Sequence, residues 1–496
     1  MTIKRIVLIC LLTGLGIQGL SQEASAPFDE QFPDGIGKHR ELFLHDDKIV
    51  ESRENVQIVI AQAEKITQQP VVKQDQPWEL GHPRWINVLY DAEEQMYKMW
   101  YQCLVEYEPY SADPAKRLAL LYATSRDGIN WEKPRFNIIE FQGKPTNITF
   151  FAVQTKQDFR APYVIKDYSD PDPQARYKAL FHCWDFRGRG LGAAISPDGV
   201  RWSAPHAYTV MQGGYDTHNT FFWDPHYGSY VAYVRRWQYG KRHIARATSP
   251  DFFHWSHDVT VMGPDERDAP DEDLYTPACF RLKEVRNVYI MVTGVFDGKK
   301  NIVTPQLAVS RDGVNWTRFR QPFIPFGKPG TWDDAGGWPR AREIPAGEHQ
   351  LFYYQGVRAA HADPDDHGSQ SGVGVAKIKR DRYIGLSAAQ KGTVTTKLVR
   401  LTHHGAVEPD GGVMALNASA VNGQIRVEVL DSDNKPIPGF SVIECSPITG
   451  DQTDFYVRWN NHQNLSPVIG KPVKLKFYLE NATIYGFQIL RDDPEL

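Results

Sequence analysis

Cysteine is scarce in this chain of 496 residues, which contains five. Cys10 lies in the apolar N-terminal segment, and the other four are Cys103, Cys183, Cys279 and Cys445. Four thiols in so long a chain do not make the dense disulfide framework of a small secreted domain. The chain has no C-x-x-C pair and no zinc-finger spacing, which argues against the common structural zinc motifs. We therefore expect these four cysteines to be buried free thiols.

The chain also lacks an excess of positive charge. It has 56 Lys and Arg against 60 Asp and Glu, which gives a formal net charge of -4 at pH 7. Such a balance argues against nucleic acid as a partner. Glycine-rich phosphate loops and Ser/His/Asp or Cys/His nucleophile signatures are absent as well, so the sequence offers no sign of those chemistries.

Long apolar runs are missing except at the N-terminus. There Lys4 and Arg5 precede the apolar segment 6–17, and small residues such as Ala24 and Ala26 offer cleavage sites. A basic start followed by a short apolar stretch is typical of a secretory signal peptide, and the stretch is too short for a spanning helix. We expect a signal peptide over 1–26, cleaved near its end, and a mature protein exported to the periplasm or secreted, with no membrane span.

Aromatic residues, by contrast, are plentiful, and some of them recur in a repeated phrase. Trp, Tyr and Phe make 12% of the chain. The phrase Ser-x-Asp-Gly-x-x-Trp occurs at 125–131, 196–202 and 310–316, with a looser copy at 249–255. Asp-Gly favours a tight turn because glycine tolerates a positive φ angle. Repeats spaced by roughly fifty to seventy residues in a strand-rich chain are typical of β-propeller blades.

Strand patterns around this phrase define five units. Each unit has a second strand rich in apolar and aromatic residues; the five are 96–102, 176–182, 229–235, 288–293 and 349–354. Outer strands are expected after the Trp of the phrase, for example at 136–141. We therefore predict an all-β chain with a five-bladed β-propeller over 38–388 as the catalytic domain. The segment 41–72 is expected to supply a strand that closes the ring of blades.

After residue 390 the pattern changes to short strands that mostly alternate polar and apolar residues, such as 423–430 and 473–478. Several antiparallel strands over about a hundred residues are typical of a β-sandwich. We predict a C-terminal β-sandwich over 395–496 as an accessory domain. Its expected role is structural, packed against the propeller, and carbohydrate binding is the alternative.

An exported five-bladed propeller followed by a β-sandwich resembles the glycoside hydrolases of families 32 and 43 and their relatives. In family 32 the first blade carries Asn-Asp-Pro-Asn, the second Arg-Asp-Pro and the third Glu-Cys. This chain reads Gly-His-Pro-Arg-Trp at 81–85 and Asp-Phe-Arg-Ala-Pro at 158–162, so Arg160 and Pro162 match while Ala161 stands in place of Asp. No Glu-Cys occurs in the third blade. The resemblance thus covers the architecture, but the catalytic triad does not transfer intact.

Glycosidic hydrolysis needs two carboxyl groups across the scissile bond, one protonated and one ionised. In the resembling families they lie at the inner ends of the first strands, around a funnel on the propeller axis. The acids that precede first strands here make Asp158, Asp216 and Asp273 the catalytic candidates. The third blade carries the acid in those families, so the resemblance implies Asp216 as general acid and Asp158 or Asp273 as base or nucleophile. An Asp before a strand is often only a turn residue, which is the alternative for each.

Aromatic, cationic and amide side chains occupy the same strand entrances and are expected to bind the substrate. The predicted set is His82, Arg84, Trp85, Arg160, His218, Asn219, Asp334, Trp338 and Arg340. The clustering of Arg and His suits an anionic or sulfated sugar, but the same residues can simply pair with neighbouring acids.

The leading hypothesis is therefore an exported glycoside hydrolase that cleaves oligosaccharides derived from complex polysaccharides, with carboxylates at the propeller axis. An oligosaccharide or polysaccharide is the expected partner, and a monomer or small homo-oligomer the expected state. No cofactor and no catalytic metal are predicted; a structural Ca2+ on the axis is the one ion considered. The alternatives are a non-catalytic carbohydrate-binding propeller, a sialidase-like enzyme, which would have six blades, and a lyase with a His/Tyr/Arg site.

Overall fold

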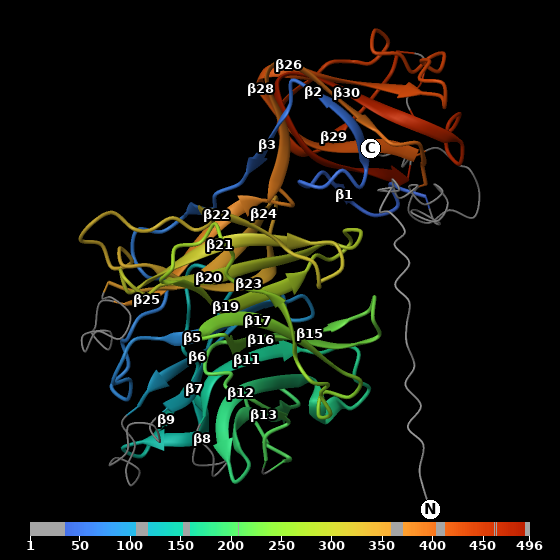
Figure 1. The fold of residues 1–496 in the computed structure, drawn as a ribbon. Helices are drawn as coiled ribbons and strands as arrows, with labels where there is room; N and C mark the ends of the chain where they lie inside the picture. Colours follow the sequence, from blue (N-terminus) through green and yellow to red (C-terminus); the bar gives the residue numbers. More distant parts are fainter. Residues whose placement is uncertain are drawn as a thin grey trace, which may run out of the picture.

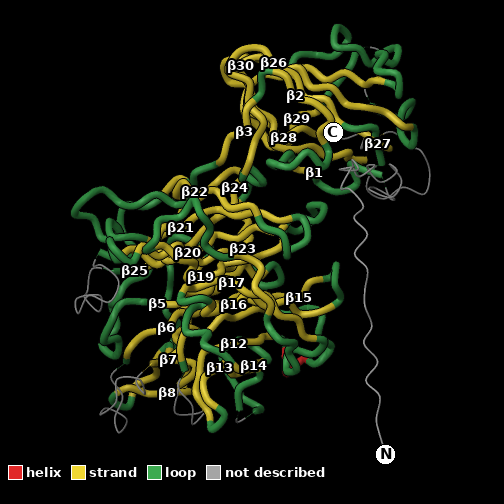
Figure 2. Tube along the Cα trace, in the orientation of Figure 1, coloured by secondary structure: helices red, strands yellow, loops and turns green. Residues whose placement is uncertain are grey.

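The computed structural model describes residues 35–105, 118–151, 159–206, 208–358, 371–402, 412–460, 462 and 464–491. These residues form β-strands almost throughout, with one short 3-10 helix, η2 (Pro173–Ala175). Figures 1 and 2 show two units, a propeller and a C-terminal sheet that lies at one edge of it. In this part of the chain no helix is long and apolar enough to cross a membrane.

Five four-stranded antiparallel sheets form the blades, and each first strand borders the axis. Blade 1 contains β5 (Arg84–Asp91), β6 (Met96–Leu104), β7 (Leu118–Ser125) and β10 (Ile148–Phe151). Blade 2 contains β11 (Arg160–Lys166), β12 (Tyr177–Asp185), β13 (Gly188–Ser196) and β14 (Met211–Gln212). Blade 3 contains β15 (Thr220–Asp224), β16 (Ser229–Gln238), β17 (Lys241–Ser249) and β18 (Val259–Met262). Blade 4 contains β19 (Glu272–Arg281), β20 (Tyr289–Asp297), β21 (Ile302–Ser310) and β22 (Thr317–Pro322). Blade 5 contains β23 (Gly337–Ala346), β24 (His349–Gly356), β25 (Gly372–Lys379) and β4 (Glu64–Lys65).

The five first strands touch one another in a closed ring, β5 to β11, β15, β19, β23 and back to β5. The predicted five-bladed propeller is therefore confirmed. The ring is closed by β4, which pairs antiparallel with β25 so that Lys65 faces Ala376. Blade 5 thus combines both ends of the propeller chain, as expected for a segment that removes the open edge. The four described cysteines are buried thiols that form no disulfide, as the sequence predicted.

The repeated phrase joins three of the blades to their preceding neighbours. Within the phrase at 125–131, the Asp127 carboxylate accepts hydrogen bonds from two backbone N–H groups, and Trp131 Nε1 donates to the Gly128 carbonyl. The same glycine carbonyl accepts a second hydrogen bond from the preceding blade; the pairs are Tyr353 to Gly128 (2.7 Å), Trp100 to Gly199 (2.6 Å) and Tyr233 to Gly313 (2.7 Å). The phrase is therefore a clasp between blades, and its Asp residues are engaged by backbone.

One outer strand differs from the prediction. The segment 136–141, expected as the outer strand of blade 1, forms β8 (Phe136–Phe141), which pairs with β9 (Lys144–Thr146) in a separate hairpin. The outer strand is β10, which pairs with β7. Ile148 and Phe150 of β10 are fully buried, whereas β8 is mostly half-exposed, so the more apolar segment takes the place in the blade.

The C-terminal unit is a single, strongly bent eight-stranded sheet. Its strands are β1 (Glu41–Leu42), β2 (Val50–Glu54), β3 (Gln57–Ile60), β26 (Ile384–Thr396), β27 (Val399–Arg400), β28 (Gly412–Leu430), β29 (Ile448–Tyr456) and β30 (Pro472–Arg491). Register shifts in the β28–β30 pair, such as the one between Ser419 and Gln424, let the sheet curve around its own core, where Trp459 and Phe477 are buried.

The domain limits differ from the expected ones at both ends. The sequence placed residues 41–60 in the propeller over 38–388 and began the C-terminal domain at 395. In the structure β1 pairs with β30, and β2 and β3 pair with β26, so these three N-terminal strands belong to the C-terminal sheet, as does β26, which begins at Ile384. These partners lie more than three hundred residues away along the chain, and local hydrophobic patterns carry no information on such pairings.

Candidate functional site

Aromatic rings from all five blades meet on the propeller axis. Tyr275 of β19 packs on Trp338 of β23 with ring centroids 4.9 Å apart, and Trp338 packs on Trp85 of β5 at 5.9 Å. His218, just before β15, lies 6.0 Å from Trp85 and 5.2 Å from Tyr163 of β11. Only Trp85 among these rings is more than one-tenth exposed. Trp85 and Trp338, predicted to bind substrate, therefore take part in a packed plug that holds the first strands together.

The backbone at two strand entrances is strained and braced. Trp85 and Ala161 have φ angles of 46° and 48°, which non-glycine residues rarely adopt. Gln355 Oε1 accepts a hydrogen bond from the N–H of Trp85 (3.3 Å), and Gln102 Oε1 accepts one from the N–H of Ala161 (3.1 Å). Gln102 also donates to the carbonyl of Phe159 (2.8 Å). A glutamine near the end of the second strand of one blade thus fixes the entrance of the next blade.

Blade 2 carries a histidine at the position that these glutamines occupy. His182 stands opposite Arg160 in its ladder, as Gln102 stands opposite Arg84. Its side chain is 2% exposed, and neither ring nitrogen has a hydrogen-bond partner among the described residues. Burial lowers the pKa of His182 to about 4; Asp216 opposes this, and Arg160 adds to it. At neutral pH His182 is therefore a neutral imidazole that does not perform the bracing role of its counterparts.

Asp216 faces this histidine from the segment that connects blades 2 and 3. Its side chain is 50% exposed, and its Oδ2 lies 3.9 Å from Nη2 of Arg235, on the second strand of blade 3. Arg235 is itself buried and donates to the carbonyl of Gly214 (3.2 Å). The structure therefore brings a half-exposed carboxylate, a buried guanidinium and a neutral imidazole together on one face of the propeller. We call Asp216, His182, Arg235 and Arg160 the axial cluster.

Asp273, the second predicted carboxylate, is neutralised by an ion pair. Its Oδ2 lies 2.9 Å from Nη1 of Arg242, and its side chain is 8% exposed. The Arg242 guanidinium also lies over the ring of Tyr275, 4.5 Å from the centroid, and Arg235 lies over the same ring at 5.2 Å. Burial raises the pKa of Tyr275, so its hydroxyl stays protonated at neutral pH. Asp273 therefore borders the axial cluster through Arg242 and Tyr275, but as a paired charge.

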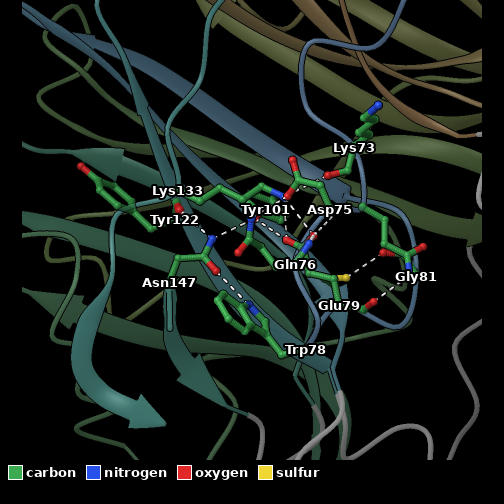
Figure 3. A network of polar contacts seen from close by, with 12 residues as sticks. Lys73, Asp75, Gln76, Trp78, Glu79, Gly81, Tyr101, Tyr122, Lys133 and Asn147 are labelled. Carbon is green, nitrogen blue, oxygen red and sulfur yellow. Dashed lines mark hydrogen bonds and ion pairs between the residues drawn. The ribbon is translucent and has the colours of Figure 1, made fainter. Parts of the chain in front are cut away.

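In the first blade, the acid that precedes the first strand is engaged by partners. Glu79, the acid nearest to its first strand, is 2% exposed and sits in the network shown in Figure 3. Its carboxylate accepts hydrogen bonds from Tyr101 (2.7 Å) and from Lys133 (2.9 Å to each oxygen), and it also receives the backbone N–H of Asp75. Glu79 thus ties the segment before β5 to blade 1. Asp158, the third catalytic candidate, lies outside the described residues.

Several residues predicted to bind substrate have structural partners. His218 Nε2 lies 2.9 Å from the carbonyl of Pro162, and burial lowers its pKa well below the usual range. Asn219 donates to the carbonyl of Tyr215 (2.7 Å) and accepts from the N–H of Arg235. His218 and Asn219 therefore shape the entrance of blade 3.

The other predicted residues are spread around the axis. Arg340 lies over Trp85, 5.0 Å from the ring centroid, and burial lowers its pKa to about 9, so it keeps its charge at neutral pH. His82 is fully buried beside Gln355, and Arg84 is half-buried at the start of β5. Asp334 accepts a hydrogen bond from the N–H of Gly330 (2.6 Å) in a loop. Of the predicted set, Arg160 stands opposite His182 in the ladder of blade 2.

The charge of this region is positive. Arg160, Arg189 and Arg235 all act on His182, and Arg242 lies beside Tyr275. Against these four cations stand Asp216 and Asp273, so the described side chains carry two more positive than negative charges here. No group of three or more His, Cys, Asp or Glu in the described part of the chain could hold a metal ion.

The predictions missed His182, Arg235, Arg242 and Tyr275. The sequence prediction selects residues at the entrances of first strands, whereas His182 and Arg235 lie near the ends of second strands. A signal was present in the sequence: the second strands place Gln102, His182, Arg235 and Gln355 directly after buried apolar runs. A polar residue at the same point of four blades indicates a shared location, and the change of residue type indicates a changed role.

Comparison with known proteins finds distant structural likenesses and no family. No protein-family model matches the chain, and no curated protein matches it. Among solved structures it is similar to a glycosyl hydrolase from Bacteroides ovatus, with 15% identity, a TM-score of 0.44, and coverage of 66% of this chain and 95% of that one. It is also similar to an N-acetylgalactosamine deacetylase from F. plautii in complex with blood group B trisaccharide, with 16% identity, a TM-score of 0.42, and coverage of 65% and 96%. Likenesses of this degree say nothing of activity.

Proposed function

We propose that this protein is a carbohydrate-active enzyme, a glycoside hydrolase that acts on anionic oligosaccharides at the axial cluster. The observation that carries the proposal is Asp216, a half-exposed carboxylate set between a buried neutral histidine and a buried arginine. Buried polar groups without protein partners are costly, so a site that contains them is suited to a ligand that supplies hydrogen bonds. The hydroxyl groups of a sugar can both donate to and accept from a neutral imidazole.

Asp216 is the carboxylate that we propose to act on the glycosidic bond. Arg235, 3.9 Å away, stabilises its negative charge. That arrangement fits a base or nucleophile better than the general-acid role that the family resemblance implies. A hydrolase of this kind needs a second carboxyl group as acid. In the described residues Asp273 is ion-paired, so it does not fit that part.

The excess of arginine favours an anionic substrate. Arg160, Arg189 and Arg235 surround His182 and Asp216, and a carboxylate or sulfate ester on the sugar would compensate their charge. Export, inferred from the N-terminal segment 1–26, is consistent with an extracellular polysaccharide as the source. We propose a structural, accessory role for the C-terminal sheet.

A lyase is the second candidate, because the cluster is rich in arginine and poor in free carboxylates. In such a reaction arginine would neutralise the carboxylate of a uronic acid, and a neutral base would remove the proton next to it. The leaving oxygen of the neighbouring sugar would depart with the bonding electrons as a carbon–carbon double bond forms. His182, neutral at pH 7, and the protonated Tyr275 are of the right types for base and acid.

Product analysis with a panel of oligosaccharides tests the proposal. The panel contains oligogalacturonides, chondroitin sulfate oligosaccharides and a neutral mannan. A hydrolase gives products whose summed mass exceeds that of the substrate by one water, without new ultraviolet absorbance. A lyase gives an absorbing unsaturated product with no added water. Binding without products would favour the non-catalytic propeller. If the protein neither binds nor cleaves any member of the panel, the proposal is contradicted.

A further inference from the structure

Exposed aromatic side chains gather at one end of blades 2 and 3. Trp184 is 44% exposed and Phe186 is 88% exposed at the turn between β12 and β13. Trp237 is 51% exposed and Tyr239 is 89% exposed at the corresponding turn between β16 and β17. Among the tryptophans in the described part of the chain, only Trp184 and Trp237 are exposed. Large exposed apolar side chains grouped in this way mark an interaction site.

The two tryptophans occupy equivalent positions and have equivalent partners. Trp184 follows His182 by two residues, and Trp237 follows Arg235 by two residues. In each ladder the tryptophan faces an arginine of the third strand, Arg189 in blade 2 and Arg242 in blade 3. The guanidinium of Arg189 lies 4.1 Å from the Trp184 ring centroid, and that of Arg242 lies 4.8 Å from the Trp237 centroid. Each indole is thus held in orientation by a cation while about half of its surface stays exposed.

The segment that carries Asp216 runs between these two hairpins. The N–H of Gly213 donates to the carbonyl of Arg189 (3.0 Å), on the blade 2 hairpin. The next residue, Gly214, lies so close to the blade 3 hairpin that a Cβ placed on it would be 3.8 Å from Cδ1 of Trp237. Asp216 follows two residues later. The two indoles therefore belong to the hairpins that contact the segment carrying Asp216.

We propose that Trp184 and Trp237 are stacking subsites for sugar rings on either side of Asp216. The inference rests on the proposed function, in that it takes the ligand to be a saccharide, and it adds that the ligand is a chain of several units. The apolar C–H face of a pyranose packs on an indole, while the adjacent Arg189 can bind a carboxylate or sulfate group of the same chain.

A saccharide fits this surface better than a protein or a lipid. All the large hydrophobic residues exposed on these two hairpins, which the structure describes in full, are aromatic. Each indole has a charged guanidinium against it, which suits an anionic ligand. Two separate flat rings, each with a guanidinium against it, match a linear, anionic sugar chain.

Affinity gel electrophoresis of the full-length protein tests the proposal. Native gels contain polygalacturonate, chondroitin sulfate or dextran, and the retardation gives a dissociation constant. We expect the anionic polysaccharides to retard the wild type, and the double variant W184A/W237A to bind at least about tenfold more weakly. Tyr168→Ala is the matched control, because Tyr168 is also exposed and flanked by cations, Lys166 and Arg176, yet lies at the opposite end of blade 2. This control should bind as the wild type does.

The outcomes separate this inference from the proposed function. Equal retardation of the wild type and W184A/W237A overturns the subsites, as does a wild type that no gel retards. A third outcome also overturns the subsites: the wild type binds phosphatidylglycerol vesicles, the double variant does not, and both are retarded equally by the polysaccharide gels. That result would indicate a membrane-binding surface. Asp216→Asn should keep its retardation and lose turnover. If it keeps full turnover the proposed reaction site is wrong, while the retardation results still decide the stacking subsites.

Discussion

Replacing His182 by glutamine should preserve the fold and remove part of its sensitivity to acid. Gln102 and Gln355 occupy the equivalent position in blades 1 and 5, so a glutamine is compatible with this site in the propeller. The imidazole of His182 is buried and neutral, whereas in the unfolded chain it titrates near its ordinary pKa of about 6.5. Between the two pKa values the unfolded chain therefore binds a proton at His182 that the folded protein does not bind.

The size of the effect follows from the pKa difference. The stability of the wild type falls as the pH drops from 6.5 towards the folded-state pKa of about 4. A difference of this size corresponds to about 3 kcal/mol when complete, and to about 2.5 kcal/mol between about pH 7.5 and pH 4.5. His182→Gln should lose this contribution, so its free energy of unfolding should depend less on pH by that amount. Other buried groups, such as His218, are common to both proteins and cancel in the comparison.

Urea unfolding at the two pH values, followed by tryptophan fluorescence, measures this difference. The exposed His226 supplies a matched control, and His226→Gln should follow the wild type at both pH values. Identical pH dependence for the wild type and His182→Gln would refute the buried neutral histidine. A large loss of stability at neutral pH would refute the equivalence of His182 with the bracing glutamines.

Two further substitutions test the scaffold. Gln102→Ala should cost about 1–3 kcal/mol of unfolding free energy, because the N–H of Ala161 loses its buried acceptor; an unchanged urea midpoint would contradict the brace. Gly199→Ala should lower the melting temperature, because φ at this residue is 78° and a Cβ would approach the ring of Trp100 to 2.7 Å; the cost should be at least about 1 kcal/mol, and a neutral result would contradict the clasp between blades.

The architecture of the propeller could be predicted because it is repeated. The second strands recur in every blade and the phrase in four of them, one copy being looser, so the count of five and the closure by an N-terminal strand were within reach of the sequence. The sheet to which β1, β2 and β3 belong could not be predicted from the sequence. Their partners lie at the far end of the chain, and their local pattern is the same in either sheet. The outer strand of blade 1 was misplaced because two adjacent segments have strand-like patterns and burial decides between them.

The site was predictable in part. Position at the entrance of a first strand led to Asp216, which lies near Arg235 and His182, and to Arg160, which stands opposite His182. The same rule also selected His218 and Asn219, whose partners are backbone groups of the scaffold. Sequence cannot separate these cases, because a polar residue at a strand entrance can serve the ligand or the backbone equally well. Three-dimensional contacts decide between the two.

The claim that the axial cluster is a reaction site depends most directly on Asp216. The measurement is kcat/KM of Asp216→Asn and of the wild type, on an oligosaccharide that the wild type cleaves, with melting temperatures as a control for folding. Asparagine keeps the size of the side chain and removes its charge, and the half-exposed position tolerates the change. We predict a loss of at least about a hundredfold in kcat/KM, the lower range for a positioned acid or base, at an unchanged melting temperature. Wild-type kcat/KM in a folded Asp216→Asn variant would contradict the account.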